Sequence, residues 1–396
     1  MATVPRPALA SIPLELRLAI FDHFLYDHKL VRSNKQPSNA HISLLHTCTQ
    51  FAYEAGQLAG YRKYISLRHE RQITSFLKVM DQYDTSHITQ IDVANDGRMV
   101  KDPQEANSQV VPVSELYLVL QNLKFLDTLR VFENHRARPL YDFHPGVRVI
   151  WAFEESLFPY QCRRELRSYE IHISPSTHII ALQNISSAKR QRLRLSGCLR
   201  LHTRKDIPNM RHLTITGVTG NFFDRIDAKP FGNSPLHTFE YAQGDRLGFE
   251  IRDRFLLSLL GDTSPHLRKL VLLGCNRLTS SALATCIQST SRLEYFALSL
   301  ITVDDWISSI IRSLPESLLV LKLKFRNALR RKITSLAADD LCASLESLFF
   351  RESPPLAVYL DLGGFIDDGR VEELKTTLVT SAVKLIFGRW EQYEHM

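Results

Sequence analysis

The sequence predicts an α/β solenoid, in which each strand of a curved parallel sheet is followed by a helix on the outer side. In the stretch LRKLVLLGC, apolar residues fall at Leu267, Leu270 and Leu272, the spacing of a short strand with one buried face. The later stretch SSALATCIQ carries Leu283 and Cys286 at helical spacing. One strand and one helix cannot bury their own apolar face, so the fold needs copies of this unit on both sides.

The copies are present at a nearly constant period. The first apolar residue of the unit recurs at Leu293, Leu318 and Leu345, which gives steps of 26, 25 and 27 residues from Leu267. Strands are predicted at the triads Leu293, Phe296 and Leu298; Leu318, Leu321 and Leu323; and Leu345, Leu348 and Phe350. Earlier strands are predicted near Ile65, Ile88, Leu126, Leu166, Leu193, Met210 and Leu236. This period is typical of leucine-rich repeats, so we predict that such repeats form the solenoid.

Length, composition and charge agree with a stacked array inside the cell. The chain has 396 residues, 44% of them hydrophobic, which is long for one compact domain but suits a solenoid. It has no uncharged apolar run long enough for a membrane span, and its opening, MATVPRPALASIP, holds no apolar signal core. The six cysteines are sparse, so we expect reduced thiols and a cytoplasmic or nuclear location. The net charge of +7 favours an acidic partner.

The N-terminal part departs from the repeat and predicts a small helical module. An apolar stripe at helical spacing includes Pro13, which is tolerated at a helix start, and a second helix is expected from Ile42 to Gly60. A polar stretch rich in turn formers around Pro37 separates the two helices. Two or three short helices cannot form a full core by themselves, so we expect the module to dock on something else.

The two helical stretches resemble the F-box. LASIPLELRLAIFDHFL is similar to the opening of that family's motif and LLHTCTQFAYEAGQLAGYRKYISL to its second half, so the resemblance covers about residues 9–67. The polar insert, residues 27–39, is longer than in many members, though such inserts are common in fungal F-box-like proteins. An F-box followed by leucine-rich repeats implies a substrate receptor of a Skp–cullin–F-box ubiquitin ligase. The resemblance assigns binding of the Skp-type adaptor to Leu9, Ile12, Pro13, Leu16, Ile20, Leu25, Leu44 and Leu45.

The predicted organisation has three parts. They are an F-box-like module over residues 1–60, a repeat solenoid over 61–368 and a C-terminal cap over 369–396. The cap is predicted as one helix from Val371 to Trp390, because a solenoid has to cover its last apolar face. Leu374, Leu378, Ala382, Leu385 and Ile386 are expected on the inward side of that helix.

Two long inserts interrupt the repeats. Residues 133–165 and 217–235 carry aromatic side chains, among them Trp151 and Phe222. Insertions of this kind map to one rim of a solenoid. We expect them either to pack on the outer side or to form an aromatic lip over the binding face.

The motifs of common enzyme chemistry are missing from the sequence. It has no glycine-rich phosphate loop, no HExxH, no CxxC pair and no GxSxG. His41 and His46 lack a third ligand at a useful spacing, so no metal site is predicted. We therefore expect a protein that is not an enzyme and that uses no cofactor.

The outward residues of the predicted strands would line one concave surface on which basic side chains dominate. We assign substrate binding to Arg192, Arg194, Lys269, Tyr295, Lys322, Lys324, Phe349 and Arg351. The strands that carry these basic residues offer no outward acid, so the ligand is predicted to be an acidic or phosphorylated segment. The alternative is that the charges only keep the sheet solvated. Nucleic acid is a weaker candidate, since no aromatic stacking platform interleaves with them.

Two functions remain open. The first is a ubiquitin-ligase receptor whose helices bind the Skp-type adaptor and, through it, a cullin, while the repeats hold a protein substrate. The second is an interaction scaffold that acts without a cullin, its helices packed on the solenoid or bound to the adaptor alone. Exposure of Ile12, Pro13, Leu16 and Ile20 in the free chain is the feature that discriminates between them.

Overall fold

The computed structural model describes residues 8–29, 39–67, 70–82, 84–95, 115–133, 164–173, 175, 178–182, 185–186, 188–201, 207–219, 234–244, 248–261, 264–301, 307–325, 335–362, 368–378, 381 and 383–391. They fall into two compact units that divide near residue 142. Most of both aromatic inserts, including Trp151 and Phe222, lies outside the described residues.

The first unit begins with a small helical module. Its elements are η1 Ala8–Ser11, α1 Leu14–Lys29, α2 Ala40–Leu45, α3 Thr49–Gln57 and α4 Ala59–Lys63. Phe21 and Leu25 lie one turn apart on α1 and face the same core. Phe51 packs edge to face on Phe21 with ring centroids 5.5 Å apart, and Ala55 and Tyr61 complete this core. One side of α1 is thereby buried within the module.

Three parallel strands with helices between them follow in the same unit. The elements are β1 Tyr64–Leu67, α5 Glu70–Met80, η2 Thr85–His87, β2 Gln90–Asn95, α6 Leu116–Asn122 and β3 Thr128–Glu133. Ile91, Val93, Leu129 and Val131 are fully buried on the helix side of these strands. The strands predicted near Ile65, Ile88 and Leu126 are therefore confirmed.

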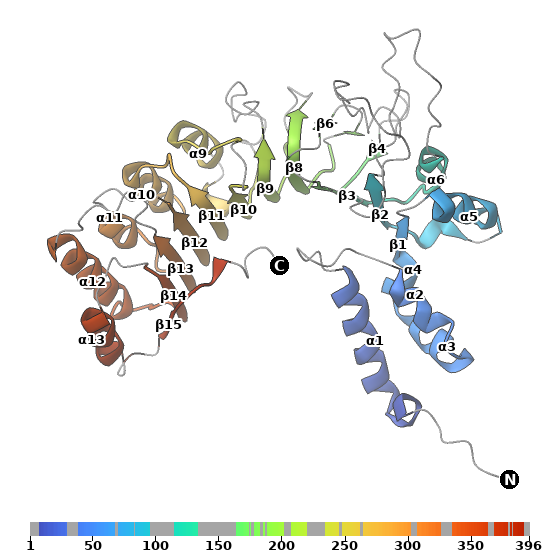
Figure 1. The fold of residues 1–396 in the computed structure, drawn as a ribbon, viewed down its shortest axis with the longest axis horizontal. Helices are drawn as coiled ribbons and strands as arrows, with labels where there is room; N and C mark the ends of the chain where they lie inside the picture. Colours follow the sequence, from blue (N-terminus) through green and yellow to red (C-terminus); the bar gives the residue numbers. More distant parts are fainter. Residues whose placement is uncertain are drawn as a thin grey trace, which may run out of the picture. The chain divides into compact units, whose positions relative to one another are not determined.

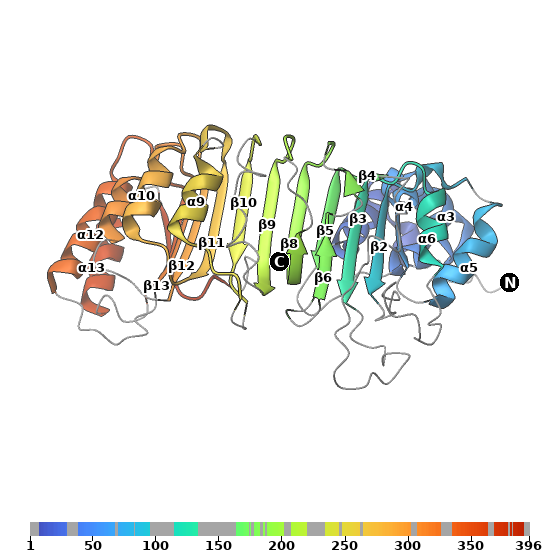
Figure 2. The ribbon, with the colours of Figure 1, turned by 90° about the horizontal axis from the view of Figure 1, so that it is seen from above.

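The second unit is a curved parallel sheet with helices along its outer face (Figure 1). Its strand order is β5-β8-β9-β10-β11-β12-β13-β14-β15, β6 pairs with β8, and β4 pairs with β7 apart from this sheet. Figure 2 shows β8 to β12 side by side. The strands are β4 Arg164–Glu165, β5 Ser168–His172, β6 His178–Ala181, β7 Ile185–Ser186, β8 Arg192–Leu201, β9 His212–Thr219, β10 Thr238–Ala242, β11 Lys269–Cys275, β12 Tyr295–Leu300, β13 Val320–Phe325, β14 Ala357–Asp361 and β15 Lys384–Phe387. The helical elements are α9 Asp253–Leu260, η4 Ser264–His266, α10 Ser280–Gln288, α11 Ile307–Arg312, α12 Ser335–Phe349 and α13 Asp368–Leu378.

The repeated leucines form the buried side of this sheet. Leu270 is in register with Phe296, and Leu272 with Leu298, and all four side chains are fully buried. Strand β13 continues the same positions, with Leu323 opposite Leu298. Equivalent residues therefore stack from repeat to repeat, which confirms the parallel α/β array predicted from the period.

A glycine–cysteine pair ends β11 and recurs as Gly197 and Cys198 within β8. Gly274 has φ +72° and Gly197 has φ +87°, a left-handed conformation that other residues rarely adopt. The pairing register shifts at both places, as at a β-bulge. Cys275 is fully buried, and burial raises the pKa of its thiol. Cys275 therefore fills the bend at the strand end, as predicted, and acts as a packing group.

The strand predicted at Leu345, Leu348 and Phe350 is wrong. Leu341, Leu345 and Leu348 are buried at helical spacing in α12, and Phe350, just after that helix, is 58% exposed. A three-residue step between leucines fits one face of a helix as well as it fits the repeat pattern. The strand of this repeat is β14, whose Val358 takes the buried position beside β13.

The predicted cap helix is wrong in its second half. Helix α13 ends at Leu378, and β15 then adds a parallel strand beside β14. Leu374 is buried as predicted, whereas Leu385 and Ile386 are half-buried on the strand. The side chain of Leu378 and the whole of Ala382 lie outside the described residues. The run VKLIF is rich in residues that favour strands, and β14 offers it a ladder to join.

Candidate functional site

Helix α1 carries apolar side chains on part of its solvent side as well as on its core side. Leu14, Leu16 and Ile20 are 40%, 57% and 43% exposed, and Pro13 at the helix start is exposed too. Leu16 and Ile20 lie one turn apart, so they are neighbours on the surface. We call Pro13, Leu16 and Ile20 the α1 face; Leu14 lies on the other side of the helix, one turn before Leu18, which packs on the core. A contiguous apolar strip of this kind is typical of a site for a protein partner.

The structure divides the residues predicted to bind an adaptor. Pro13, Leu16 and Ile20 are exposed and lie on the α1 face. Leu9, Ile12, Leu44 and Leu45 are half-buried, and Leu9, Leu44 and Leu45 pack against the module core. The prediction that Leu25 contacts the adaptor is wrong. Its side chain is 3% exposed, because it lies one turn after Phe21 on the core side of α1.

A buried ion pair holds the α1 face in place. Arg17 Nε donates to Glu54 Oε2 of α3 at 2.7 Å, and Arg17 Nη2 donates to Glu54 Oε1 at 2.5 Å. Arg17 also donates to the carbonyl oxygens of Ala10 and Ile12, which fixes the turn before Pro13. The hydrogen bond from Arg17 is the main reason that the pKa of the Glu54 carboxyl is lowered. Sequence reasoning missed the pair because its members lie 37 residues apart.

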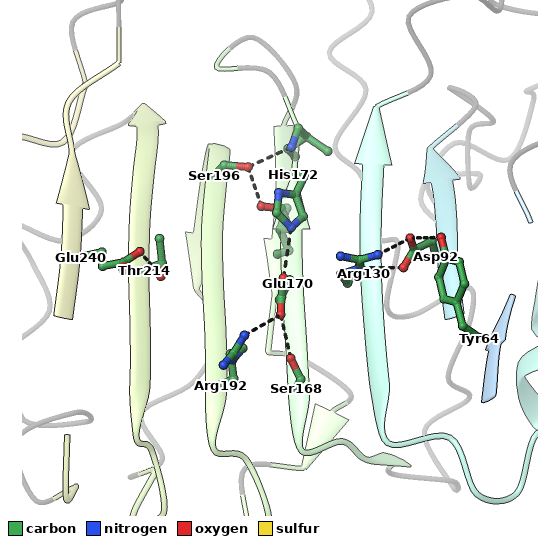
Figure 3. A network of polar contacts seen from close by, with 12 residues as sticks. Tyr64, Asp92, Arg130, Ser168, Glu170, His172, Arg192, Ser196, Thr214 and Glu240 are labelled. Carbon is green, nitrogen blue, oxygen red and sulfur yellow. Dashed lines mark hydrogen bonds and ion pairs between the residues drawn. The ribbon is translucent and has the colours of Figure 1, made fainter. Parts of the chain in front are cut away.

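The inner face of the second unit is the second candidate surface, and over β5, β8, β9 and β10 it is polar (Figure 3). Ser168 Oγ donates to Glu170 Oε1 at 3.0 Å, and His172 Nε2 lies 3.2 Å from Glu170 Oε2. On the neighbouring strands, Thr214 Oγ1 donates to Glu240 Oε2 at 3.3 Å. Acidic side chains therefore sit within this face and already have partners.

The basic residues predicted to hold an acidic substrate have these acids as neighbours. Lys269 Nζ lies 2.8 Å from Glu240 Oε1, and Arg192 Nη1 lies 4.0 Å from Glu170 Oε1. Arg194 is half-buried, and burial lowers its pKa against the attraction of Glu170 and Glu240. The expectation of an uncompensated basic face is therefore wrong here. The sequence places Glu170 and Glu240 outward on other strands and predicts a local basic region, whereas the strands of these acids, β5 and β10, lie only one or two strands from the basic residues.

From the end of β10 and over β11 to β14 the inner face changes from polar to apolar and aromatic. A cluster there is formed by Ala242, Val271, Leu273, Ala297 and Trp390, with Tyr295 and Tyr359 packed on it. Trp390 comes from the segment after β15, is 2% exposed and donates its Nε1 hydrogen to the carbonyl oxygen of Leu323 at 3.1 Å. Lys322 Nζ lies 4.8 Å from the ring centroid of Tyr359 and 5.3 Å from that of Tyr295. Both are cation–π distances, so Lys322 and Tyr295 lie together as predicted.

The other predicted substrate residues are engaged or lie elsewhere. Lys324 is buried and pairs with Glu391, and its Nζ also lies 3.9 Å from Asp361 Oδ2. The prediction that Phe349 and Arg351 point outward from a strand of the concave sheet is wrong, because neither residue is on a strand. Phe349 is buried in α12. Arg351 follows that helix and donates to backbone carbonyl oxygens, the nearest at 2.6 Å.

The face of β1 to β3 opposite the apolar core carries a charged triad that sequence reasoning missed (Figure 3). Tyr64 Oη donates to Asp92 Oδ2 at 2.7 Å, and Arg130 Nε and Nη2 donate to the two Asp92 oxygens at 2.7 and 2.6 Å. Burial, followed by the charge of Asp92, raises the pKa of the Tyr64 phenol. Asp92 is fully buried, so the triad ties three strands together and presents no carboxylate to a ligand.

Neither a metal site nor a membrane helix is found among the described residues. In that part of the chain, no three His, Cys, Asp or Glu side chains come together as metal ligands would, and no helix combines the length and apolar character needed to cross a bilayer. Comparison of the sequence with protein-family models finds no match, and comparison with curated proteins finds none either. The α1 face and the inner face are therefore the two surfaces from which function is inferred.

Proposed function

We propose that the chain is the substrate-recognition subunit of a Skp–cullin–F-box ubiquitin ligase. The observation that carries this proposal is the α1 face, which stays exposed although the helical module has an apolar core of its own. The resemblance of residues 9–67 to the F-box makes the Skp-type adaptor the partner for that face. The repeats then hold the protein substrate on their inner face.

In this function the chain acts by proximity and performs no chemistry on the substrate. The adaptor connects the helical module to a cullin, and the ubiquitin-conjugating enzyme at the cullin meets a substrate lysine at a raised effective concentration. Arg192 on β8 is the basic residue best placed for an acidic or phosphorylated segment of that substrate, because its side chain is 55% exposed and its contact with Glu170 is long, at 4.0 Å. Lys269 is a weaker candidate because Glu240 already pairs with it.

Adaptor binding by a chain with a charged α1 face tests the proposal. Leu16→Glu with Ile20→Glu should abolish co-purification of the Skp-type adaptor, because the carboxylates would be buried without partners in an apolar interface. The matched control is Leu319→Glu with Leu356→Glu, which changes two leucines of the second unit that are 43% and 65% exposed. This control should bind the adaptor as the wild-type chain does, and urea denaturation checks that both variants stay folded.

Unchanged adaptor binding by the folded Leu16→Glu, Ile20→Glu chain would contradict the proposal. A pull-down with the cullin is the second readout. A chain that binds the adaptor through the α1 face but brings no cullin with it would instead be an interaction scaffold.

A further inference from the structure

The segment after β15 turns back over the inner face of the sheet. Gly388 N still donates to Leu360 O at 3.0 Å, but Gly388 has φ +136°, and no atom lies within 4 Å of the place where a Cβ would be. Gly388 is therefore an exposed turning point at a conformation that favours glycine. Arg389 after it is exposed, whereas Trp390 is buried. We call residues 388–391 the strap.

The ring of Trp390 lies where neighbouring strands present small apolar side chains. Ala242 on β10, Val271 on β11 and Ala297 on β12 occupy outward positions, and they are 5%, 4% and 0% exposed in the cluster that contains Trp390. Outward residues of a sheet face that meets water are usually polar. Small apolar residues on three adjacent strands instead form an apolar seat for a large ring, and such a patch is typical of a binding site.

Basic side chains lie next to this seat and match the rest of the strap. Lys322 Nζ lies 5.9 Å from the ring centroid of Trp390, and Lys324 Nζ pairs with Glu391. Lys324 is buried, and Glu391 of the strap adds to the compensation of its charge by Asp361, whose Oδ2 lies 3.9 Å from Nζ. The strap therefore presents an aromatic residue followed by an acid to a seat that complements both.

We propose that this seat binds a partner segment in which a large aromatic residue is followed by an acidic one, and that the strap occupies the seat in cis. The partner's aromatic ring replaces the Trp390 indole over Val271 and Ala297, and its carboxylate replaces that of Glu391 beside Lys324. Naming the partner as the substrate rests on the proposed ligase function, whereas the binding itself does not. Because the strap is tethered, at an effective concentration of about millimolar, it competes with every such partner.

The test uses the full-length chain and a fluorescent peptide of its own residues 387–396, FGRWEQYEHM, in an anisotropy titration. The Trp390→Ala chain, whose strap no longer fills the seat, should bind this peptide. The wild-type chain should bind it at least about tenfold more weakly, because its own strap competes. Peptides with alanine in place of the tryptophan, or glutamine in place of the glutamate after it, should also lose about tenfold or more against the Trp390→Ala chain.

A matched pair of second substitutions locates the binding to the seat. In the Trp390→Ala chain, the second substitution Ala297→Trp fills the seat with a side chain from β12, so peptide binding should be lost. The second substitution Leu319→Glu lies outside the seat, so peptide binding should be kept. If Trp390→Ala has no cooperative unfolding transition, Glu391→Lys, which keeps the indole and removes the pairing with Lys324, takes its place.

Three results would overturn the proposal. They are absence of peptide binding by a folded strap variant, equal binding of the tryptophan-free peptide, and loss of folding in both strap variants, which would make the strap part of the core. The peptide titration contains no adaptor. A failure of the seat and a failure of the α1 face are therefore separate results.

Discussion

The α1 face and the seat beneath Trp390 are both apolar, but they differ in what covers them. Leu16 on the α1 face is 57% exposed, whereas Ala297 in the seat is fully buried. A partner that covers the α1 face gains the whole burial free energy, about 25 cal/mol per Å² of apolar area. A partner that covers the seat first has to displace the strap, which offsets most of that gain. The bare face therefore suits a permanent partner, and the covered seat suits a conditional one.

The largest effect that sharpens this comparison is expected at the bare face. Leu16→Gln with Ile20→Gln removes two interface anchors worth about 2 kcal/mol each, so adaptor binding should weaken about a thousandfold. The free energy of unfolding of the chain alone should change by less than about 0.5 kcal/mol, because both side chains are exposed. Calorimetric titration with the adaptor and urea denaturation measure the two quantities. A loss of stability as large as the loss of binding would place these residues in the core.

Leu270→Ala provides the reference for packing that needs no partner. Leu270 is fully buried, so the substitution should lower the free energy of unfolding by about 2–5 kcal/mol. Because stacked repeats contact only their neighbours, amide exchange should accelerate mainly in β10, β11 and β12. Adaptor binding should not change. Faster exchange throughout both units would contradict the stacked array.

Trp390→Ala should cost less than a core substitution, because the indole covers the outside of a sheet that is already formed. We expect a loss of about 2 kcal/mol, below the about 3–5 kcal/mol that is usual when a core tryptophan is truncated. Amide exchange in the ladder of β11 to β13 should stay slow, while binding of a hydrophobic dye should rise as the seat opens. Loss of protection in that ladder would show that Trp390 belongs to the core of the second unit.

The smallest effect concerns the acid stability of the helical module. Arg17 lowers the pKa of Glu54 in the folded chain below its ordinary value of 4.5. The unfolded carboxylate therefore takes up protons at a higher pH than the folded one. The pair stabilises the module above the ordinary pKa, and this contribution is lost as the pH falls through the folded pKa.

Glu54→Gln tests this dependence. It should lower the stability near neutral pH and flatten its decline between about pH 5 and 3, as followed by thermal unfolding of both chains. Gln50, which donates to Glu54 Oε1 at 2.9 Å, offers the control Gln50→Ala, which keeps the Arg17 pair. Parallel pH profiles for the wild-type and Glu54→Gln chains would show that the pair does not affect stability.

The array was predictable wherever neighbouring repeats share one spacing. Leu270 and Leu272 predicted β11 correctly, because Phe296 and Leu298 in the next repeat have the same two-residue spacing and lie beside them in the sheet. The pattern failed at Leu345, where leucines three residues apart suit a helix equally well and no following copy resolves the ambiguity. Whether such a run becomes a strand or a helix is decided by its neighbours in space.

The candidate surfaces were predictable only where one element defines them. The α1 face follows from α1 alone, since the helical period turns Leu16 and Ile20 away from the side on which Phe21 and Leu25 are buried. The pairing of Lys324 with Glu391 joins residues 67 positions apart, and it depends on the turn at Gly388. No local pattern contains that path, so Lys324 was predicted as an open substrate contact although it is buried.

Strand β15 is the last strand in the order of the sheet, and in the part of the chain that the structure describes no further strand pairs with its outer edge. It is four residues long, and it begins with the exposed Lys384. Short edge strands that carry a charge resist pairing with strands of other molecules. By turning the chain away directly after β15, Gly388 ends the ladder before it is long enough to template polymerisation of the sheet.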